Sequence, residues 1–354
     1  MEESSLATGI SLAEKSFTLE GIRDNCRVDG RSNFEFRKLS VSTGVVPTEF
    51  GSARVSNGEA DVIVGVKADL VPPRLAAPSH GEVFVNVSFA APAAAEKRLV
   101  ELGESHSACG LRLGSLLAQY CFGELVFPRT LLCVKPGVFV WHLYVDVLVL
   151  AVGGSLLDLA SVAVAAALKD CRLPAVQVVV KTAAGCEGDD AQLVRLVEAA
   201  GGGDEAAAAD GLEPGVIRFQ EVSAGGLFDV RLASLHQVMR FRIHKTERLR
   251  VPGCERVPIL VGLGLVGNHA VADLTQEEGH TVSHRVFAAV DESGQVVGIG
   301  KTSAGYVAGL TLPVLSTVAL RAQALGKQLF EQVLSDEELA TRRTNSLRLL
   351  PSLI

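Results

Sequence analysis

The acidic stretch from Asp273 to Gly279 contains the side chains best placed for chemistry. It reads Asp-Leu-Thr-Gln-Glu-Glu-Gly, with carboxylates at positions 273, 277 and 278. Small and apolar residues from Pro258 to Ala272 lead into it, so we expect it at the end of a strand or hairpin that faces a cleft. Converging carboxylates at such a place hold a metal ion on a phosphate, or position an acid for a leaving group.

A structural role for Asp273 agrees equally well with the sequence. If a helix follows this residue, its carboxylate would cap the first turn. Asp273 and Glu277 would then share one helical face, since residues four apart lie above one another, whereas Glu278 would point elsewhere. The catalytic acid and the helix cap both stay open at this point.

A second candidate is the run Gly153-Gly-Ser-Leu-Leu-Asp158. A glycine pair before a helix leaves backbone N–H groups directed outward at a partial positive charge, which suits an oxyanion. Ser155 and Asp158 also match the Ser-x-x-Asp capping pattern, and the run itself contains no Arg or Lys. We therefore favour helix capping over anion binding here.

His280 and His284 form a spaced pair that could ligate a metal ion. They lie four residues apart, yet the Glu of the H-E-x-x-H pattern is missing between them. Neither a Walker loop nor a G-x-S-x-G elbow is evident. The sequence thus predicts no metal site and no cofactor.

The elements that must position these residues follow a pattern of strands and helices that occurs twice. The periodicity predicts a first set of strands at 61–66, 83–89, 131–134 and 143–150, with helices at 97–120 and 155–169. A second set follows at 175–181, 258–266, 285–290 and 295–299, with a hairpin turn at 292–294 and a helix at 312–334. No clear linker separates the sets, so we expect an internally duplicated α+β fold.

The segment 183–256 interrupts this order. It begins with an acidic, Gly- and Ala-rich part that includes residues 201–210, which is typical of an insertion with a flexible start. It continues with a basic run at 240–250 whose charges alternate as on an exposed strand. That run could bind RNA or a partner, but a solvated sheet edge is the simpler interpretation.

Composition narrows the class of protein. The 354 residues are 48% hydrophobic with a formal net charge of -7, which indicates a globular chain with a substantial core and argues against coating nucleic acid by bulk charge. The seven cysteines form no C-x-x-C pair, so we expect buried thiols in a reducing compartment. The acidic start of the chain lacks the pattern of a secretory signal, and we expect the protein to stay inside the cell.

The apolar stretch 147–168 is membrane-like in hydropathy, but Gly153, Gly154 and Asp158 fall within it. A buried strand followed by a buried helix explains it better, and no membrane association is expected.

Several blocks of the sequence together form a recognisable set. They are Cys26-Arg-Val-Asp-Gly-Arg31 with Arg37, followed by the segments 51–58, 61–66, 141–147, 153–158, 266–273 and 297–301. These blocks resemble the RNase PH family, and within it the non-phosphorolytic branch that forms ring subunits of the RNA exosome. The resemblance covers nearly all of the chain except its first twenty-odd residues, the insertion and the C-terminal end.

This resemblance implies an RNase PH-like fold of two duplicated β-β-α-β-α-type halves, similar to domain 2 of ribosomal protein S5. It also implies assembly into a hexameric ring with other RNase PH-like subunits around a channel for single-stranded RNA, with S1/KH-type cap subunits. The implied divisions are an N-terminal extension (1–25), a first half (26–182), the atypical insertion (183–256), a second half (257–335) and a C-terminal tail (336–354).

The resemblance further implies a degenerate site. Active members grip phosphate with Gly-Thr-Arg or Gly-Ser-Ser at the start of the helix, where this chain has Gly154, Ser155 and Leu156. They carry an acid at the place of Asp273 and a second one where this chain has Gly279. Candidate RNA contacts are Lys97, Arg98 and Arg112, although residues 116–122 lack the arginine that relatives place there.

We therefore expect a catalytically silent exosome subunit in the nucleus, including the nucleolus, and in the cytoplasm. The main alternative is an active phosphorolytic 3′–5′ exoribonuclease. A binding module independent of any ring is a third hypothesis, which predicts a stable monomer.

Overall fold

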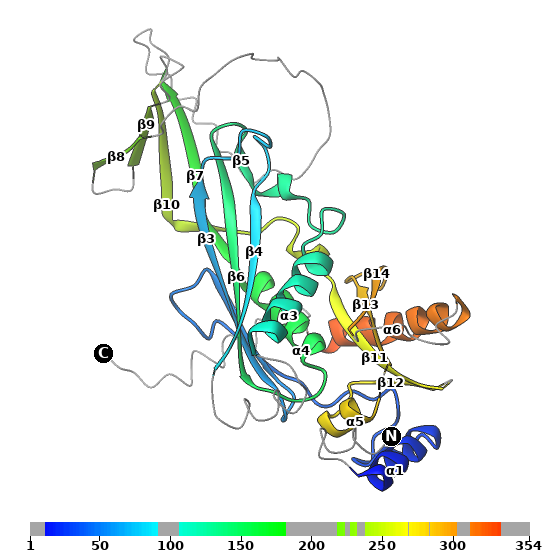
Figure 1. Cartoon of the computed structure of the whole chain (residues 1–354). Helices are drawn as coiled ribbons and strands as arrows, with labels where there is room; N and C mark the ends of the chain where they lie inside the picture. Colours follow the sequence, from blue (N-terminus) through cyan, green and yellow to red (C-terminus); the bar gives the residue numbers. More distant parts are fainter. Residues whose placement is uncertain are drawn as a thin grey trace, which may run out of the picture.

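The computed structural model describes residues 11–90, 106–181, 218–223, 227–231, 238–267, 269–282, 284–302 and 312–333. Within these ranges the chain forms three sheets with helices packed against two of them (Figure 1). The mixed α+β class predicted from the pattern is confirmed.

The first sheet is the largest element of the described chain. Its strands run in the order β1 (Ser40–Thr43), β2 (Gly51–Ser56), β3 (Asp61–Val71), β6 (Phe139–Ala151) and β4 (Glu82–Phe89), with the short β5 (Cys133–Lys135) beside β6. All pairs are antiparallel except β4 with β6. Alternate residues of β3 and β6, such as Val64 and Val145, are fully buried, so one face of this sheet is covered.

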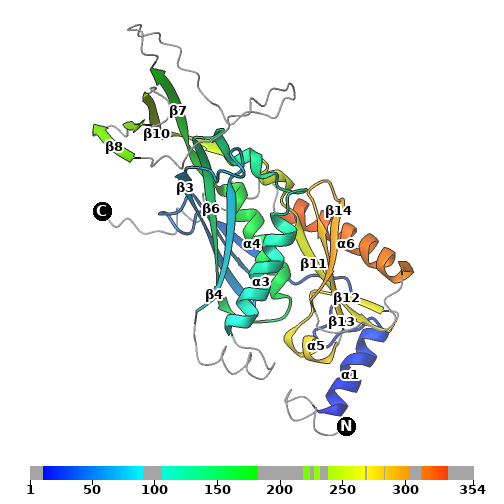
Figure 2. The ribbon, with the colours of Figure 1, turned by 45° about the horizontal axis from the view of Figure 1, so that its top comes forward.

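Two helices cover that face. Helix α4 (Leu156–Asp170) packs on β2 and β3, and α3 (His106–Cys121) packs on β4 (Figure 2). Nearly every residue of α4 is buried, because its small Ala and Val side chains let it pack between this sheet and β11 of the next one. The start of α4 therefore lies where the two sheets approach each other.

The second sheet carries the acidic stretch. Its strands run in the order β12 (His269–Ala272), β11 (Ile259–Val266), β13 (His284–Val290) and β14 (Val296–Lys301), and α6 (Leu312–Val333) packs on it. The short α5 (Gln276–Thr281) follows β12, and α1 (Leu12–Arg23) packs beside both. Helix α5 thus contains Glu277, Glu278 and Gly279 of the acidic stretch, and Asp273 lies shortly before it.

The third sheet combines a strand that precedes the insertion with three strands of the insertion itself. Strand β10 (Val238–Arg250) lies between β7 (Arg172–Lys181) and β9 (Leu227–Arg231), and β8 (Arg218–Ser223) pairs with β9. The predicted basic strand at 240–250 is confirmed as β10. Its interpretation as a sheet edge is wrong for residues 240–242, which pair on both sides, whereas from 243 to 250 the pairing partner within the described residues is β7 alone.

Most of the remaining predicted elements are confirmed. The turn at 292–294 closes β13 to β14 with Gly294 at φ 81°, and α6 matches the helix predicted at 312–334. The strand predicted at 131–134 is partly wrong, because residues 129–132 form a 3₁₀ turn (η1) before β5. The helix predicted at 97–120 is described from His106 onward, and its first residues lie outside the described ranges.

The apolar stretch 147–168 divides between β6 and α4, as predicted. Among the described helices, none combines the length and the apolar character that crossing a bilayer requires.

The expected buried thiols are found at Cys109, Cys121, Cys171 and Cys254, whereas Cys133 is half-buried and Cys26 is exposed. None of these six forms a disulfide bond within the described residues, and Cys186 lies outside those residues. Burial raises the pKa of Cys121 and of Cys171 to about 12, so these two thiols stay protonated and unreactive.

Candidate functional site

The carboxylate of Asp273 is engaged by two arginines. Arg37 binds it through Nη2 to Oδ1 at 2.6 Å and through Nε to Oδ2 at 2.8 Å, and its backbone N–H donates to Oδ2 as well. Arg31 adds a bond from Nη1 to Oδ2 at 2.9 Å. The charge of this acid is thus neutralised inside the fold, which leaves it poorly suited to donate or accept a substrate proton.

Electrostatics at Asp273 support the same conclusion. The residue is 2% exposed, and burial alone would raise its pKa. The hydrogen bonds and charges of Arg37 and Arg31 outweigh burial and hold the pKa below its usual value. The backbone of Asp273 is left-handed at φ 45°, a conformation rare outside glycine, which turns its side chain toward these arginines.

The capping role considered for Asp273 is wrong. Thr275 caps α5: its hydroxyl accepts from the backbone N–H of Glu278, and the Glu278 carboxylate accepts from the N–H of Thr275 at 2.8 Å. Because α5 begins at Gln276, Asp273 and Glu277 do not share a helical face.

The three carboxylates of the stretch do not converge. Glu278 is buried and paired with the equally buried Arg27, whose Nε donates to Oε1 at 2.8 Å. Glu277 is exposed, and Asp273 faces the other two arginines. The segment 26–37, which we call the N-terminal strap, therefore supplies all three guanidiniums that bind Asp273 and Glu278.

Gly279 lies beside a fourth arginine. A Cβ at this position would stand 3.5 Å from Nη2 of Arg285, and that guanidinium donates to the carbonyl oxygen of Gly279. A basic side chain thus adjoins Gly279.

The helix-capping role predicted for Ser155 is also wrong. Ser155 adopts a left-handed conformation at φ 54°, makes no side-chain cap on α4, and donates its hydroxyl to the carbonyl of Leu274 at 3.3 Å. Gly154 contacts the same loop, because a Cβ there would lie only 1.9 Å from the Leu274 oxygen. The start of α4 and the loop after β12 are therefore held against each other.

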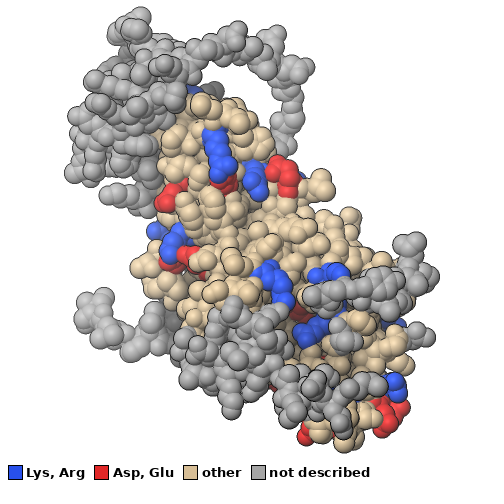
Figure 3. Space-filling view, in the orientation of Figure 1, with Lys and Arg blue, Asp and Glu red and all other residues tan. Residues whose placement is uncertain are grey.

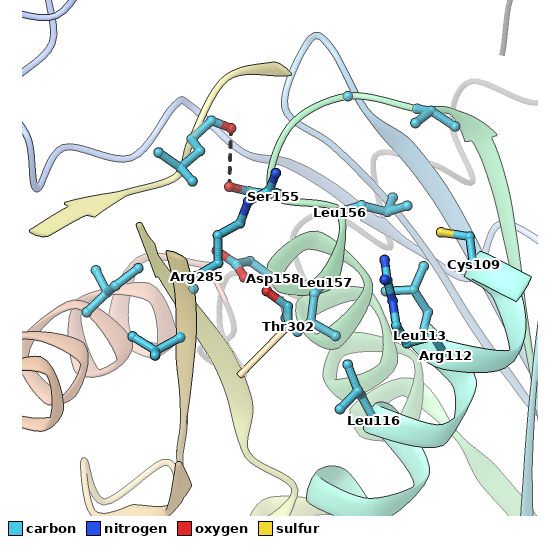
Figure 4. A pocket seen from close by; sticks show the side chains of 16 residues that line it. Cys109, Arg112, Leu113, Leu116, Ser155, Leu156, Leu157, Asp158, Arg285 and Thr302 are labelled. Carbon is cyan, nitrogen blue, oxygen red and sulfur yellow. Dashed lines mark hydrogen bonds between the residues drawn. The ribbon is translucent and has the colours of Figure 1, made fainter. Parts of the chain in front are cut away.

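A cavity of about 160 Å³ opens beside this junction, and we call it the α4 hollow (Figure 4). Side chains from α3, from the start of α4 and from β13 enclose it. Its lining residues include Cys109, Arg112, Leu113, Leu116, Ser155, Leu156, Leu157, Asp158, Leu274, Arg285 and Thr302. The lining is mainly apolar, with two guanidiniums and one carboxyl group among it.

The α4 hollow unites only part of the predicted site. It brings Ser155, Leu156 and Arg112 to one cavity, whereas Gly154 and Asp273 are not part of its lining. Lys97 and Arg98 lie outside the described residues.

Two residues of the hollow were missed or misjudged from the sequence. Arg285 opens an ordinary strand and gave no signal. Asp158 appeared as a helix-capping acid, but it is 6% exposed and its Oδ2 finds no hydrogen-bond partner in the described structure. Burial, and then the charge of Asp273, raise the pKa of Asp158 to about 8, against the effects of the Gly262 N–H and of Arg37.

The histidine pair does not form a ligand set. His280 belongs to α5 and His284 to β13, so the two do not lie on one helical face. Over the described ranges, no three His, Cys, Asp or Glu side chains gather closely enough to hold a metal ion.

Comparison with known proteins gives a consistent result. Residues 35–174 match the RNase PH domain described as "3′ exoribonuclease family, domain 1". The chain is 33% identical over 175 residues to exosome complex component Rrp42 of Methanothermobacter thermautotrophicus, covering 47% of this chain and 60% of the relative. It is 33% identical over 174 residues to exosome complex component RRP45 of Danio rerio, covering 48% and 42%. Its matches thus span about half the length of these relatives.

Solved structures share the fold at lower identity. An Archaeoglobus fulgidus exosome with RNA bound to the active site contains a chain that superposes with a TM-score of 0.59 at 21% identity, covering 90% of this chain and 96% of that one. A chain of an archaeal exosome core gives a TM-score of 0.58 at 20% identity, covering 95% and 100%. These likenesses concern the fold.

Proposed function

This chain belongs to the RNase PH family, and from that premise we propose that it is a non-catalytic structural subunit of an RNA exosome core ring. In that role it supports 3′–5′ RNA processing and degradation, including the maturation of ribosomal RNA. The similarity to Rrp42 and RRP45 supports the assignment to the ribosomal RNA-processing protein 42 type.

The main observation behind the proposed lack of catalytic activity is that Asp273 forms ion pairs with both Arg31 and Arg37. An acid whose oxygens are already bound by two guanidiniums, and whose pKa is held low, is a poor proton donor at neutral pH. Leu156 at the helix start and Gly279 beside Arg285 stand where the family resemblance implies a phosphate-binding side chain and a second acid in active members. Losing preorganised charge of this kind typically costs about 10²–10³ in rate for each donor.

The proposal extends to the assembly. Its halves 26–182 and 257–335 would be duplicated units, and the packing of helices on the first and second sheets supports this. We place the subunit beside other RNase PH-like subunits in a hexameric ring, with S1/KH-type caps and single-stranded RNA in the channel. We also propose that it acts in the nucleus, the nucleolus and the cytoplasm.

A phosphorolysis assay tests the silence. Purified chain is incubated with single-stranded RNA and inorganic phosphate, and the release of nucleoside diphosphates is measured. We expect no release above the enzyme-free blank. Phosphate-dependent release that disappears in both Asp273→Asn and Leu156→Glu would overturn the proposal. The second variant lies at the rim of the hollow and leaves the Asp273 ion pairs intact, so it separates lost chemistry from lost folding.

One observation favours the alternative, an active phosphorolytic 3′–5′ exoribonuclease. Arg112 and Arg285 bring positive charge to the α4 hollow from elements other than α4. The same assay decides between the two functions, because only the active exoribonuclease predicts a phosphate-dependent release of nucleoside diphosphates.

A further inference from the structure

The size and walls of the α4 hollow suit a compact apolar group. Leu113 and Leu116 of α3 face Leu156 and Leu157 of α4 across it, and its volume is about 160 Å³. An apolar protein cavity of about 150 Å³ accommodates one benzene molecule. The hollow can therefore hold a body of about that size, and exclude water from most of its surface.

Charge around the hollow favours a negatively charged ligand. Arg112 projects from α3 and Arg285 from β13, on opposite sides of the start of α4 (Figure 4). The N-terminus of α4 lies between them, and the side chain of Ser155 does not cap it. Guanidiniums and an uncapped helix start both stabilise an anion, and a carboxylate matches the planar guanidinium fork.

Asp158 supplies a second and independent indication of a ligand. It lines the hollow, is more than nine-tenths buried, and leaves Oδ2 without a partner among the described residues. Its raised pKa means that the group is largely a neutral carboxylic acid at pH 7, with a proton to donate. Buried hydrogen-bond donors normally have an acceptor, so a ligand that accepts a hydrogen bond from Asp158 Oδ2 would supply the missing partner.

From these contacts we propose that the α4 hollow binds a small monocarboxylate whose apolar body is about the size of one benzene ring. Its carboxylate accepts from Arg112, Arg285 and Asp158, and its body packs among the leucines. A phosphate fits less well, because it has no apolar body to pack among the leucines. The inference rests on the proposed function only in that a silent site is free to take a ligand other than RNA and phosphate.

Calorimetry with sodium benzoate as the probe tests this site. We expect saturable one-to-one binding to the full chain at pH 7, at least tenfold tighter than binding of acetate or inorganic phosphate. Arg112→Gln removes one charge-assisted hydrogen bond at an exposed position and should weaken benzoate roughly tenfold. The matched control is Arg129→Gln, which alters another exposed arginine outside the hollow and should leave affinity unchanged.

The pH dependence tests the part played by Asp158. The charged or titratable groups around it are Asp273, Arg37, Arg285, Arg112 and Cys109. We expect benzoate affinity to fall roughly tenfold from pH 7 to pH 9 as Asp158 loses its proton, and to change little over this range in Asp158→Asn, whose amide still donates.

The inference is overturned if benzoate gives no saturable heat, if inorganic phosphate binds as tightly, or if Arg112→Gln matches the wild type. No RNA is present in this experiment. If benzoate does not bind, the proposal that the chain is non-catalytic therefore still stands. Turnover in the phosphorolysis assay would overturn that proposal separately.

Discussion

At the scale of single residues, the chain separates two acids that lie close in space. Asp273 keeps its charge because Arg31 and Arg37 bind it, whereas Asp158 loses its charge because burial and the charge of Asp273 oppose ionisation. Environments that push two pKa values apart often mark catalytic pairs. Here Asp273 is held in ion pairs with two arginines, so the difference between the two pKa values has a structural role rather than a catalytic one. Asp158 remains as a neutral hydrogen-bond donor in the hollow.

The raised pKa of Asp158 makes stability depend on pH. In the unfolded chain this acid ionises near its ordinary value of 3.8, whereas in the folded chain it keeps its proton up to about pH 8. Between these values the folded state binds one more proton, so stability falls as pH rises, by roughly 1.4 kcal/mol per pH unit from this group. Above pH 8 this loss is complete.

Asp158→Asn should remove that loss. We expect the free energy of unfolding in urea to decline less between pH 5 and pH 8.5 in the variant than in the wild type, so that the variant is the more stable of the two at pH 8.5. Exposed Asp69→Asn is the matched control and should follow the wild type. Parallel curves for Asp158→Asn and the wild type would contradict the assignment.

At the scale of elements, the junction between the start of α4 and the loop after β12 determines the shape of the site. Gly154 and Ser155 contact Leu274, and Arg37 bridges both sides through the carbonyls of Gly154 at 3.4 Å and Leu274 at 3.2 Å. The start of α4 and the loop after β12 therefore approach each other so closely at Gly154 that a side chain has no room there.

Gly154→Ala should disrupt this junction. Its new Cβ would lie 1.9 Å from the Leu274 oxygen, so the loop must shift and the Arg37 bonds must lengthen. We expect a loss of about 1–3 kcal/mol in the free energy of unfolding. Gly114→Ala in α3 is the control: its Cβ would meet ordinary contacts at 3.4 Å and should be neutral or stabilising. Equal stabilities of the two variants would argue against the junction.

Elements long enough to show a repeating apolar pattern were predictable from the sequence, and the shortest elements were not. The many Val, Leu and Ala residues of strand β6 and helix α4 predict both elements, and the structure buries most of these side chains. By contrast, β12 has four residues and α5 has six, too few for a period to emerge. The partners of Asp273 lie 236 and 242 positions away, so no local pattern could show that this acid was sealed.

At the scale of the whole molecule, the surface agrees with a subunit whose affinity for RNA is local. On the face shown in Figure 3, basic side chains occur in small groups with acidic ones nearby, and no continuous basic stripe crosses the coloured residues. The net charge of -7 likewise argues against binding RNA through bulk positive charge. Such a chain would gain its RNA path from an assembly.

Native mass spectrometry of the assembly isolated from its own cells tests this. We expect the chain in a complex with related RNase PH-like subunits, six in the ring, and we expect denaturing spectra of the same sample to identify each of them. Recovery of the chain as a stable monomer, without paralogous partners, would instead favour the independent binding module.

The N-terminal strap has a consequence for the order of synthesis. Arg27 pairs with Glu278, which follows it by 251 positions. At ribosomal rates of about 5–20 residues per second, roughly 10–50 seconds pass between the appearance of the two residues. During that interval three arginines that end up buried or nearly so must wait in solvent, while the first sheet can already form. The strap, although made early, is thus among the last parts of the molecule to reach its final place.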